Sequence, residues 1–166
     1  MLIQCVVESV RVHTLTGQHV VMLQPKDSDR YLPIWIGADQ AASIATQLAG
    51  IHPDRPLTHD LMIDILAKLG VEITRVVVRD LVESGDGNGV FHGSIFIQAG
   101  EREVEIDSRA SDAIALALRC DARILVADAV LDRSALRPDA DLSAADDDLS
   151  IFKQFINTLP DDPSVG

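Results

Sequence analysis

Aromatic residues and cysteines are scarce in this chain of 166 residues, which holds one tryptophan, one tyrosine, four phenylalanines and two cysteines. Cys5 and Cys120 form no Cys-x-x-Cys pair and lie in apolar surroundings, so we expect reduced core residues instead of a disulfide or a zinc site. No segment approaches the ~20 apolar residues of a membrane span, and no basic, apolar and cleavage-site regions follow one another at the N-terminus. We therefore expect a cytoplasmic protein.

Positive charge is also scarce, because 14 lysines and arginines face 26 acidic residues, for a net charge of −12. Residues 139–166 hold seven aspartates against Lys153 alone, which is −6 and half of the total. An acidic protein repels a phosphate backbone at long range, and nucleic-acid-binding proteins usually show a basic surface. Binding of nucleic acid would therefore depend on local arginines, or on a basic groove formed by oligomerisation.

Several catalytic motifs are absent from the sequence. It has no Gly-x-Ser-x-Gly and no catalytic Cys–His arrangement, which disfavours covalent catalysis. The glycine-rich run at 85–89 lacks the Lys-Ser/Thr ending of a phosphate-binding loop and indicates a hairpin turn. Trp35, the only tryptophan, lies in a predicted strand, where core packing competes with stacking on a base.

Aliphatic side chains are abundant, and 47% of the residues are hydrophobic, enough for one domain with a core. We expect this domain over residues 1–137. Residues 138–166 are expected to form an acidic linker and a C-terminal amphipathic helix, because Phe152, Phe155, Ile156 and Leu159 have helical spacing.

Apolar periodicity and turn residues predict a strand-rich chain in which one order of elements occurs twice. The predicted strands are 3–12, 20–23, 31–36, 71–82, 90–98, 103–107 and 123–127, and the predicted helices are 41–48, 58–69, 111–119 and, as a short helix or turn, 129–136. In the helix at 58–69, Leu61, Ile65 and Leu69 are expected to form the core face.

Each half of the chain thus runs strand, strand, strand, helix. A shift of 70 residues places Ile36 on Ile106 and Leu48 on Leu118, although the repeated order of elements is the stronger evidence. The expected fold is α+β, with pseudo-duplicated strand-strand-strand-helix units that form a mainly antiparallel sheet with helices packed on it.

Two polar clusters stand at the predicted helix starts, at residues 55–60 (RPLTHD) and 107–114 (DSRASDAI). Backbone N–H groups at a helix start point outward and can hold an anion. Together the clusters provide acids, one histidine and two arginines, which suits a phosphate-bearing ligand or a metal ion.

These clusters, together with residues 32–37 (LPIWIG), resemble the bifunctional nuclease domain family, whose members degrade DNA and RNA. The resemblance runs from the first strand to about Leu131, and its third motif covers residues 107–118. Two positions depart from the family pattern: Gln40 stands where Glu is usual, and Ala110 where Pro is usual. The resemblance implies a nuclease of low sequence specificity, and the change at Gln40 removes a carboxylate that a metal-dependent mechanism could use.

The chemistry of the clusters suggests a role for each polar side chain. Asp107 and Asp112 would converge on a divalent cation, Mg²⁺ or Mn²⁺, that assists attack of water on a phosphodiester. His59 would shuttle a proton or bind the metal. The proposed catalytic residues are His59, Asp60, Asp107 and Asp112, with Asp107 and Asp112 as metal ligands and Arg55, Arg109 and Ser111 as substrate-binding residues.

Structural alternatives exist for the same residues. Thr58 and Ser111 can cap their helices, Asp60 can tune the first of these caps, and Arg109 can pair with Asp107 or Asp112. The chain would then be a non-enzymatic anion-binding or regulatory oligomeric module. In either case we expect a homodimer, because a sheet edge and the apolar stripe of the tail need a partner surface.

Overall fold

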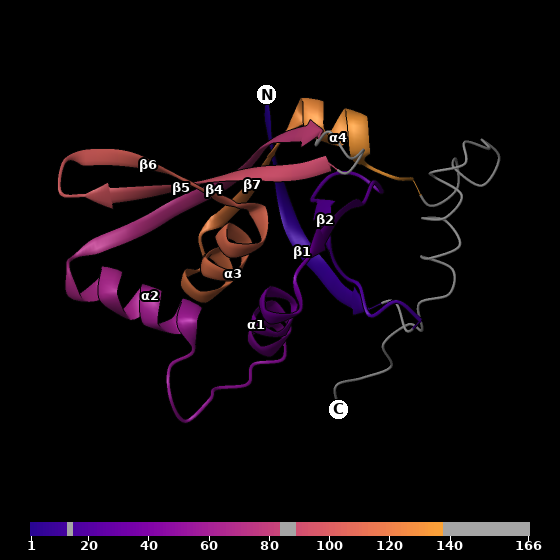
Figure 1. Ribbon diagram of the computed structural model, residues 1–166. Helices are drawn as coiled ribbons and strands as arrows, with labels where there is room; N and C mark the ends of the chain where they lie inside the picture. The colour runs from indigo at the N-terminus through magenta and orange to yellow at the C-terminus, as the bar shows by residue number, and fades with distance from the viewer. Residues whose placement is uncertain (13–14, 84–88, 138–166) are drawn as a thin grey trace.

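The computed structural model describes residues 1–12, 15–83 and 89–137, which form a curled sheet of seven strands with four helices packed on it (Figure 1). The predicted acidic linker and C-terminal helix, and residues 84–88 of the predicted turn, lie outside the described residues. In chain order the elements are β1 (Leu2–Val12), β2 (His19–Pro25), β3 (Leu32–Ile36), α1 (Ala38–Leu48), α2 (Thr58–Lys68), β4 (Val71–Glu83), β5 (Gly89–Ala99), β6 (Arg102–Arg109), α3 (Ala110–Cys120), β7 (Arg123–Ala127) and α4 (Asp128–Ser134).

The strand order of the sheet is β3-β2-β1-β7-β4-β5-β6, so β7 separates two three-stranded meanders. Neighbouring strands are antiparallel except for β4 and β7, which pair in parallel. The series β1-β2-β3-α1 and β4-β5-β6-α3 show the predicted repeated order. The prediction of an α+β fold with a mainly antiparallel sheet is therefore confirmed.

Strands β1 and β4 contain register irregularities that bend the sheet. Pairing shifts between Val7 and Ser9 in β1, between Ile73 and Arg75 in β4, and again between Val78 and Asp80. An extra residue at such a point bends the strand and increases its twist. The curl brings the end of β3, at one edge of the sheet, close to the start of β5 and the end of β6, since all three line one cleft.

The helices α1, α2 and α3 cover one face of the sheet, and α3 is central among them (Figure 1). From Ala110 to Ala117, every residue of α3 except Asp112 is buried. Its alanines allow the neighbouring helices to approach, while Ile114 and Leu116 fill the core beside Ile44 of α1. The central helix therefore has little freedom to move, and polar groups at its two ends are held in fixed positions.

The predicted core face of α2 is wrong. Leu61, Ile65 and Leu69 are exposed, whereas His59 is buried and Ile63 is partly buried against the core. The helix packs against α3 and β4 at the periphery of the helical layer, so only a narrow strip is covered. The sequence places apolar residues on more than one side of α2, and periodicity alone did not reveal which side faces inward.

Two predicted caps also differ from the structure. The N-cap residues are Leu57 for α2 and Arg109 for α3, each with an extended backbone, so Thr58 and Ser111 already lie within the first turns. Strand β6 runs directly into α3 without a loop, which moves the helix start ahead of the serine. The hydroxyl groups of Thr58 and Ser111 are therefore not occupied as caps.

Both cysteines are free thiols; Cys5 is buried as expected, whereas Cys120 is only partly buried, and burial raises the pKa of Cys5 to about 11. No helix in the described part of the chain is long and apolar enough to cross a membrane.

Candidate functional site

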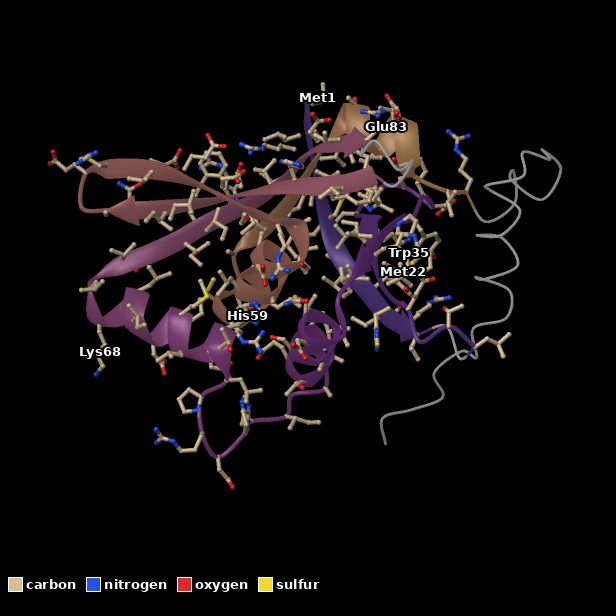
Figure 2. The ribbon with its side chains drawn as sticks, in the orientation of Figure 1. Met1, Met22, Trp35, His59, Lys68 and Glu83 are labelled. Atoms are coloured by element: carbon tan, nitrogen blue, oxygen red, sulfur yellow. The ribbon has the colours of Figure 1, made fainter. Side chains whose placement is uncertain are left out.

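A chain of hydrogen bonds joins α1, α2 and α3 through four side chains. Ser43 Oγ lies 2.7 Å from His59 Nδ1, and His59 Nε2 lies 3.0 Å from Asp112 Oδ1. The other carboxylate oxygen of Asp112 accepts a 2.7 Å hydrogen bond from Arg109 Nε. Figure 2 shows His59 between the three helices. We refer to Ser43, His59, Asp112 and Arg109 as the polar chain.

The donors along the polar chain follow from the chemistry of Asp112, because an ionised carboxylate only accepts hydrogen bonds. In its neutral form, the His59 ring therefore carries its proton on Nε2, and Nδ1 then accepts from the Ser43 hydroxyl. With 7% of the residue exposed, His59 has both ring nitrogens occupied inside the protein. Only Asp112, at 25%, and Arg109, at 66%, present side chains of the polar chain to solvent.

Burial alone would raise the pKa of Asp112. Hydrogen bonds from Arg109 and His59 outweigh this effect and hold the pKa of that carboxyl below its usual range. Asp112 is thus ionised at neutral pH, which keeps its interactions with both neighbours charge-assisted.

A second, partly buried interaction lies beside the polar chain. Arg119, whose side chain is 5% exposed, donates from Nε to Asp60 Oδ1 at 2.7 Å and from its terminal nitrogens to the carbonyl oxygens of Ser43 and Ala115. Asp60 Oδ2 accepts the backbone N–H of Leu57 at 3.0 Å. Asp60 therefore forms an ion pair with Arg119 and also accepts a backbone N–H at the start of α2, which is the capping role that the sequence suggested.

The pKa of Asp60 is subject to opposing effects. Burial raises it, but hydrogen bonds from Arg119 and from the Leu57 backbone outweigh this effect, so the pKa lies below its usual range. Asp60 is adjacent to His59 in sequence, yet its hydrogen bonds are to Arg119 and Leu57 instead of to the polar chain. This arrangement favours a positioning role for Asp60.

The structure does not bring Asp107 to Asp112. Asp107 is largely exposed on β6 and forms an ion pair with Arg79 of β4, next to the pair of Arg79 and Glu105. Asp112 instead contacts His59 and Arg109. Among residues 1–12, 15–83 and 89–137, no group of three or more His, Cys, Asp or Glu side chains is placed to hold a metal ion. The two carboxylates thus do not share a preformed cation site in this arrangement.

The remaining predicted site residues lie at the surface or beside a cleft. Arg55 is exposed on the loop that precedes α2. Ser111 is buried and, with Arg109, lines a cleft of about 290 Å³ between the end of β3, the start of β5 and the first turn of α3. Arg109 therefore belongs both to the polar chain and to the wall of the cleft.

Sequence reasoning missed Ser43 and Arg119. Ser43 stands beside Ile44 in the middle of an otherwise apolar helix segment, which is a signal for a buried polar contact. Arg119 follows Asp112 by seven residues, two helical turns, so both share one face of α3. The position of Arg119 on the same face as Asp112 was the signal in the sequence that could have identified it.

Comparison with known proteins gives two findings. The sequence profile of the bifunctional nuclease domain matches residues 21–139. Two uncharacterized proteins of Mycobacterium tuberculosis, from strains CDC 1551 / Oshkosh and ATCC 25618 / H37Rv, are each 38% identical over 163 residues, which cover 94% of this chain and 94% of the relative. The matched residues 21–139 of this chain contain all four positions of the polar chain.

Proposed function

The chain belongs to the bifunctional nuclease domain family, and from this we propose that it hydrolyses phosphodiester bonds in DNA and RNA with low sequence specificity. The observation that carries the proposal is the hydrogen bond between His59 and Asp112. It joins two sequence motifs that are 53 residues apart and places them beside a cleft that an arginine lines. A purely local capping role would not require this contact between the helices.

Cleavage of a phosphodiester needs neutralisation of charge on the phosphate and removal of a proton from the attacking water. In the proposal, Arg109 and Ser111 bind the phosphate, and Asp112 orients the attacking water and accepts its proton as the water oxygen bonds to phosphorus. The bond from phosphorus to the leaving nucleoside oxygen breaks in the same step, and solvent water protonates that oxygen. His59 stabilises Asp112 and exchanges protons through it, because both ring nitrogens are already bonded. Ser43 and Asp60 are positioning residues. Arg55 contacts the nucleic acid at a point away from the bond that is cleaved.

Assistance by a divalent metal, Mg²⁺ or Mn²⁺, remains part of the proposal. Asp107 and Asp112 each pair with a different arginine, so they do not fit as joint ligands in this arrangement. Mg²⁺ commonly combines one or two carboxylates with water and substrate phosphate oxygens. We therefore derive no catalytic step through the metal.

Degradation of labelled single-stranded RNA and DNA by purified protein tests the proposal, with Mg²⁺, Mn²⁺ or EDTA and with Asp112→Asn and Asp107→Asn prepared identically. We expect metal-dependent cleavage that Asp112→Asn lowers by orders of magnitude. Loss of activity in Asp107→Asn alone would favour the site expected from sequence. Equal cleavage by wild type and both variants would identify a contaminating nuclease and contradict the proposal.

A non-enzymatic anion-binding module is the second candidate. The specific observation in its favour is His59, which is buried with both nitrogens bonded and so resembles a structural histidine. This candidate predicts that phosphate-bearing ligands bind without any turnover. Absence of cleavage by wild-type protein under all metal conditions would favour it.

We also propose a homodimer, and the exposed apolar side of α2 supports it. Leu61, Met62, Ile65 and Leu69 leave an apolar strip on the surface of the described residues. Sedimentation velocity should show a dimer that Ile65→Glu dissociates, with Asp64→Asn as the control on the same helix. A wild-type monomer at micromolar concentration would contradict this part of the proposal.

A further inference from the structure

The cleft beside the polar chain lies where the two edges of the curled sheet approach each other. Residues from the end of β3, the start of β5 and the first turn of α3 line its volume of about 290 Å³. This volume is near the lower end of the range for small-molecule sites, about 300 Å³ and upward. It admits one small ligand and not a long stretch of polymer.

Two helices of 11 residues begin at this cleft, α1 after Gly37 and α3 after Arg109. Neither N-cap residue makes a side-chain capping hydrogen bond. The first N–H groups of a helix have no intrahelical acceptor and carry the positive end of the helix dipole, so they attract anions. Both helix starts therefore favour a negatively charged ligand.

Ser111 provides independent evidence for a ligand. It lines the cleft, is only 8% exposed, and its hydroxyl has no hydrogen-bond partner in the described part of the chain. Most buried polar side-chain atoms in proteins do have such a partner. The hydroxyl is thus available to an oxygen atom that enters the cleft, next to the exposed guanidinium of Arg109.

The charges around the cleft decide which helix start suits a phosphate. Asp39 lies in the first turn of α1 and opposes an anion there. Asp112 lies in the first turn of α3, but Arg109 and His59 already contact its two carboxylate oxygens. The phosphate position is therefore at α3, between Ser111 and Arg109.

We propose that this cleft binds one nucleotide unit of a single-stranded nucleic acid, with its phosphate at the first turn of α3 and its base against Trp35. Trp35 lines the cleft, is 45% exposed, and lies over the β2–β3 side of the sheet (Figure 2). Stacking on an aromatic ring accepts any base, but a base within a duplex is not available for it. The inference rests on the proposed function, whose substrate it restricts to single strands.

The test uses the full chain and does not depend on turnover. Because Trp35 is the only tryptophan, its fluorescence reports on this cleft alone. Deoxyadenosine 5′-monophosphate should change the fluorescence saturably, and inorganic phosphate should compete with it at higher concentration. Equilibrium dialysis with the labelled nucleotide measures the same binding without relying on the tryptophan.

Two variants separate the parts of the proposed site. Ser111→Ala should weaken nucleotide binding about tenfold, because a hydrogen bond to a charged group is lost, whereas Ser134→Ala on α4 should bind like wild type. Trp35→Leu, assayed by dialysis, should bind nucleotide no better than inorganic phosphate. Equal nucleotide affinity in wild type and Ser111→Ala, or no binding by dialysis, would overturn the proposal.

Cleavage assays on the same samples keep the two proposals distinct. Cleavage of RNA without nucleotide binding would overturn the cleft assignment and leave the nuclease proposal intact. Nucleotide binding without cleavage would support the cleft and overturn the nuclease proposal. Single-stranded oligonucleotides should compete for the cleft at least about tenfold better than duplexes of the same sequence, and equal competition would overturn the single-strand restriction.

Discussion

Arg119 and Asp60 are 59 residues apart in sequence, yet Arg119 Nε donates a 2.7 Å hydrogen bond to Asp60 Oδ1. The guanidinium also contacts the backbone carbonyl of Ser43, so one nearly buried side chain on α3 connects α1 and α2. His59 of α2 connects the same three helices through its own hydrogen bonds, to Ser43 of α1 and to Asp112 of α3. The geometry of the polar chain thus depends on a neighbouring ion pair that does not itself contact the cleft.

Replacement of Arg119 by methionine should strongly destabilise the fold. The variant keeps an apolar stem but leaves the Asp60 carboxylate without its ion-pair partner. Because a quarter of the Asp60 side chain is exposed, we expect a cost of about 1–3 kcal/mol, below that of a fully buried pair. Arg133→Met is the matched control, because Arg133 is half-exposed and its pairs with Asp80 and Glu83 are long, so we expect less than about 1 kcal/mol. Urea unfolding measures both values, and equal effects would contradict the assignment.

Replacement of Ser43 by alanine should lower activity without preventing folding. His59 Nδ1 would lose its partner in a buried position, which costs about 1–3 kcal/mol and corresponds to at least about a tenfold loss in kcat if the ring turns away from Asp112. KM should change little, and the pH profile should shift. Thr46→Ala on α1 is the control, because that hydroxyl bonds only to its own helix. Identical profiles for Ser43→Ala and wild type would exclude a positioning role.

The lowered pKa of Asp112 predicts a specific dependence of stability on pH. A carboxyl whose pKa is lower in the folded state stabilises the fold above its ordinary pKa of about 4 and loses this contribution as the pH falls through the folded-state value. Asp112→Asn should therefore have a lower Tm than wild type at pH 7, and the two Tm values should converge between about pH 5 and pH 2. A difference that stays constant down to pH 2 would show that the carboxylate charge is not responsible.

Substitution of Gly93 should disturb the start of α3. A Cβ at this position of β5 would lie 3.1 Å from the Ala110 Cα and 3.2 Å from the Ala110 nitrogen, so the helix start would have to move. We expect Gly93→Ala to cost about 1–3 kcal/mol through overpacking, and Gly93→Val to cost more. Nucleotide binding should weaken in parallel with the loss of stability. Stability equal to wild type in both variants would show that the contact is not tight.

Much of the fold could be predicted, because strand alternation and glycine positions are local signals. The side of α2 that faces inward could not, since Ile65 and Ile63 are equally apolar and only the packing against α3 selects between them. The first residue of α3 could not be predicted either. The extended backbone of β6 continues into Arg109, and no local rule distinguishes this from a cap at Ser111.

For the candidate site, the sequence predicted that residues at the starts of α2 and α3 take part. It did not predict which side chains those residues contact. Neighbouring residues in a strand point to opposite faces, and Ser108 lies against Gly93 and Ala110 on the helical side. Asp107 therefore points to the other face and meets Arg79. Contacts such as Ser43 with His59 depend on how α1 and α2 approach each other, which no spacing within a single helix encodes.

The polar chain also constrains when during synthesis the site can exist. Ser43 and His59 precede the second meander, Arg109 is its last residue, and Asp112 follows it. The network therefore closes only after β4, β5 and β6 have left the ribosome and paired. Contacts between residues this far apart in sequence form late, because the loop must close before they stabilise anything. A nascent chain that ends before α3 would carry the histidine but not its acid, so the site of the proposed nuclease activity would still be incomplete.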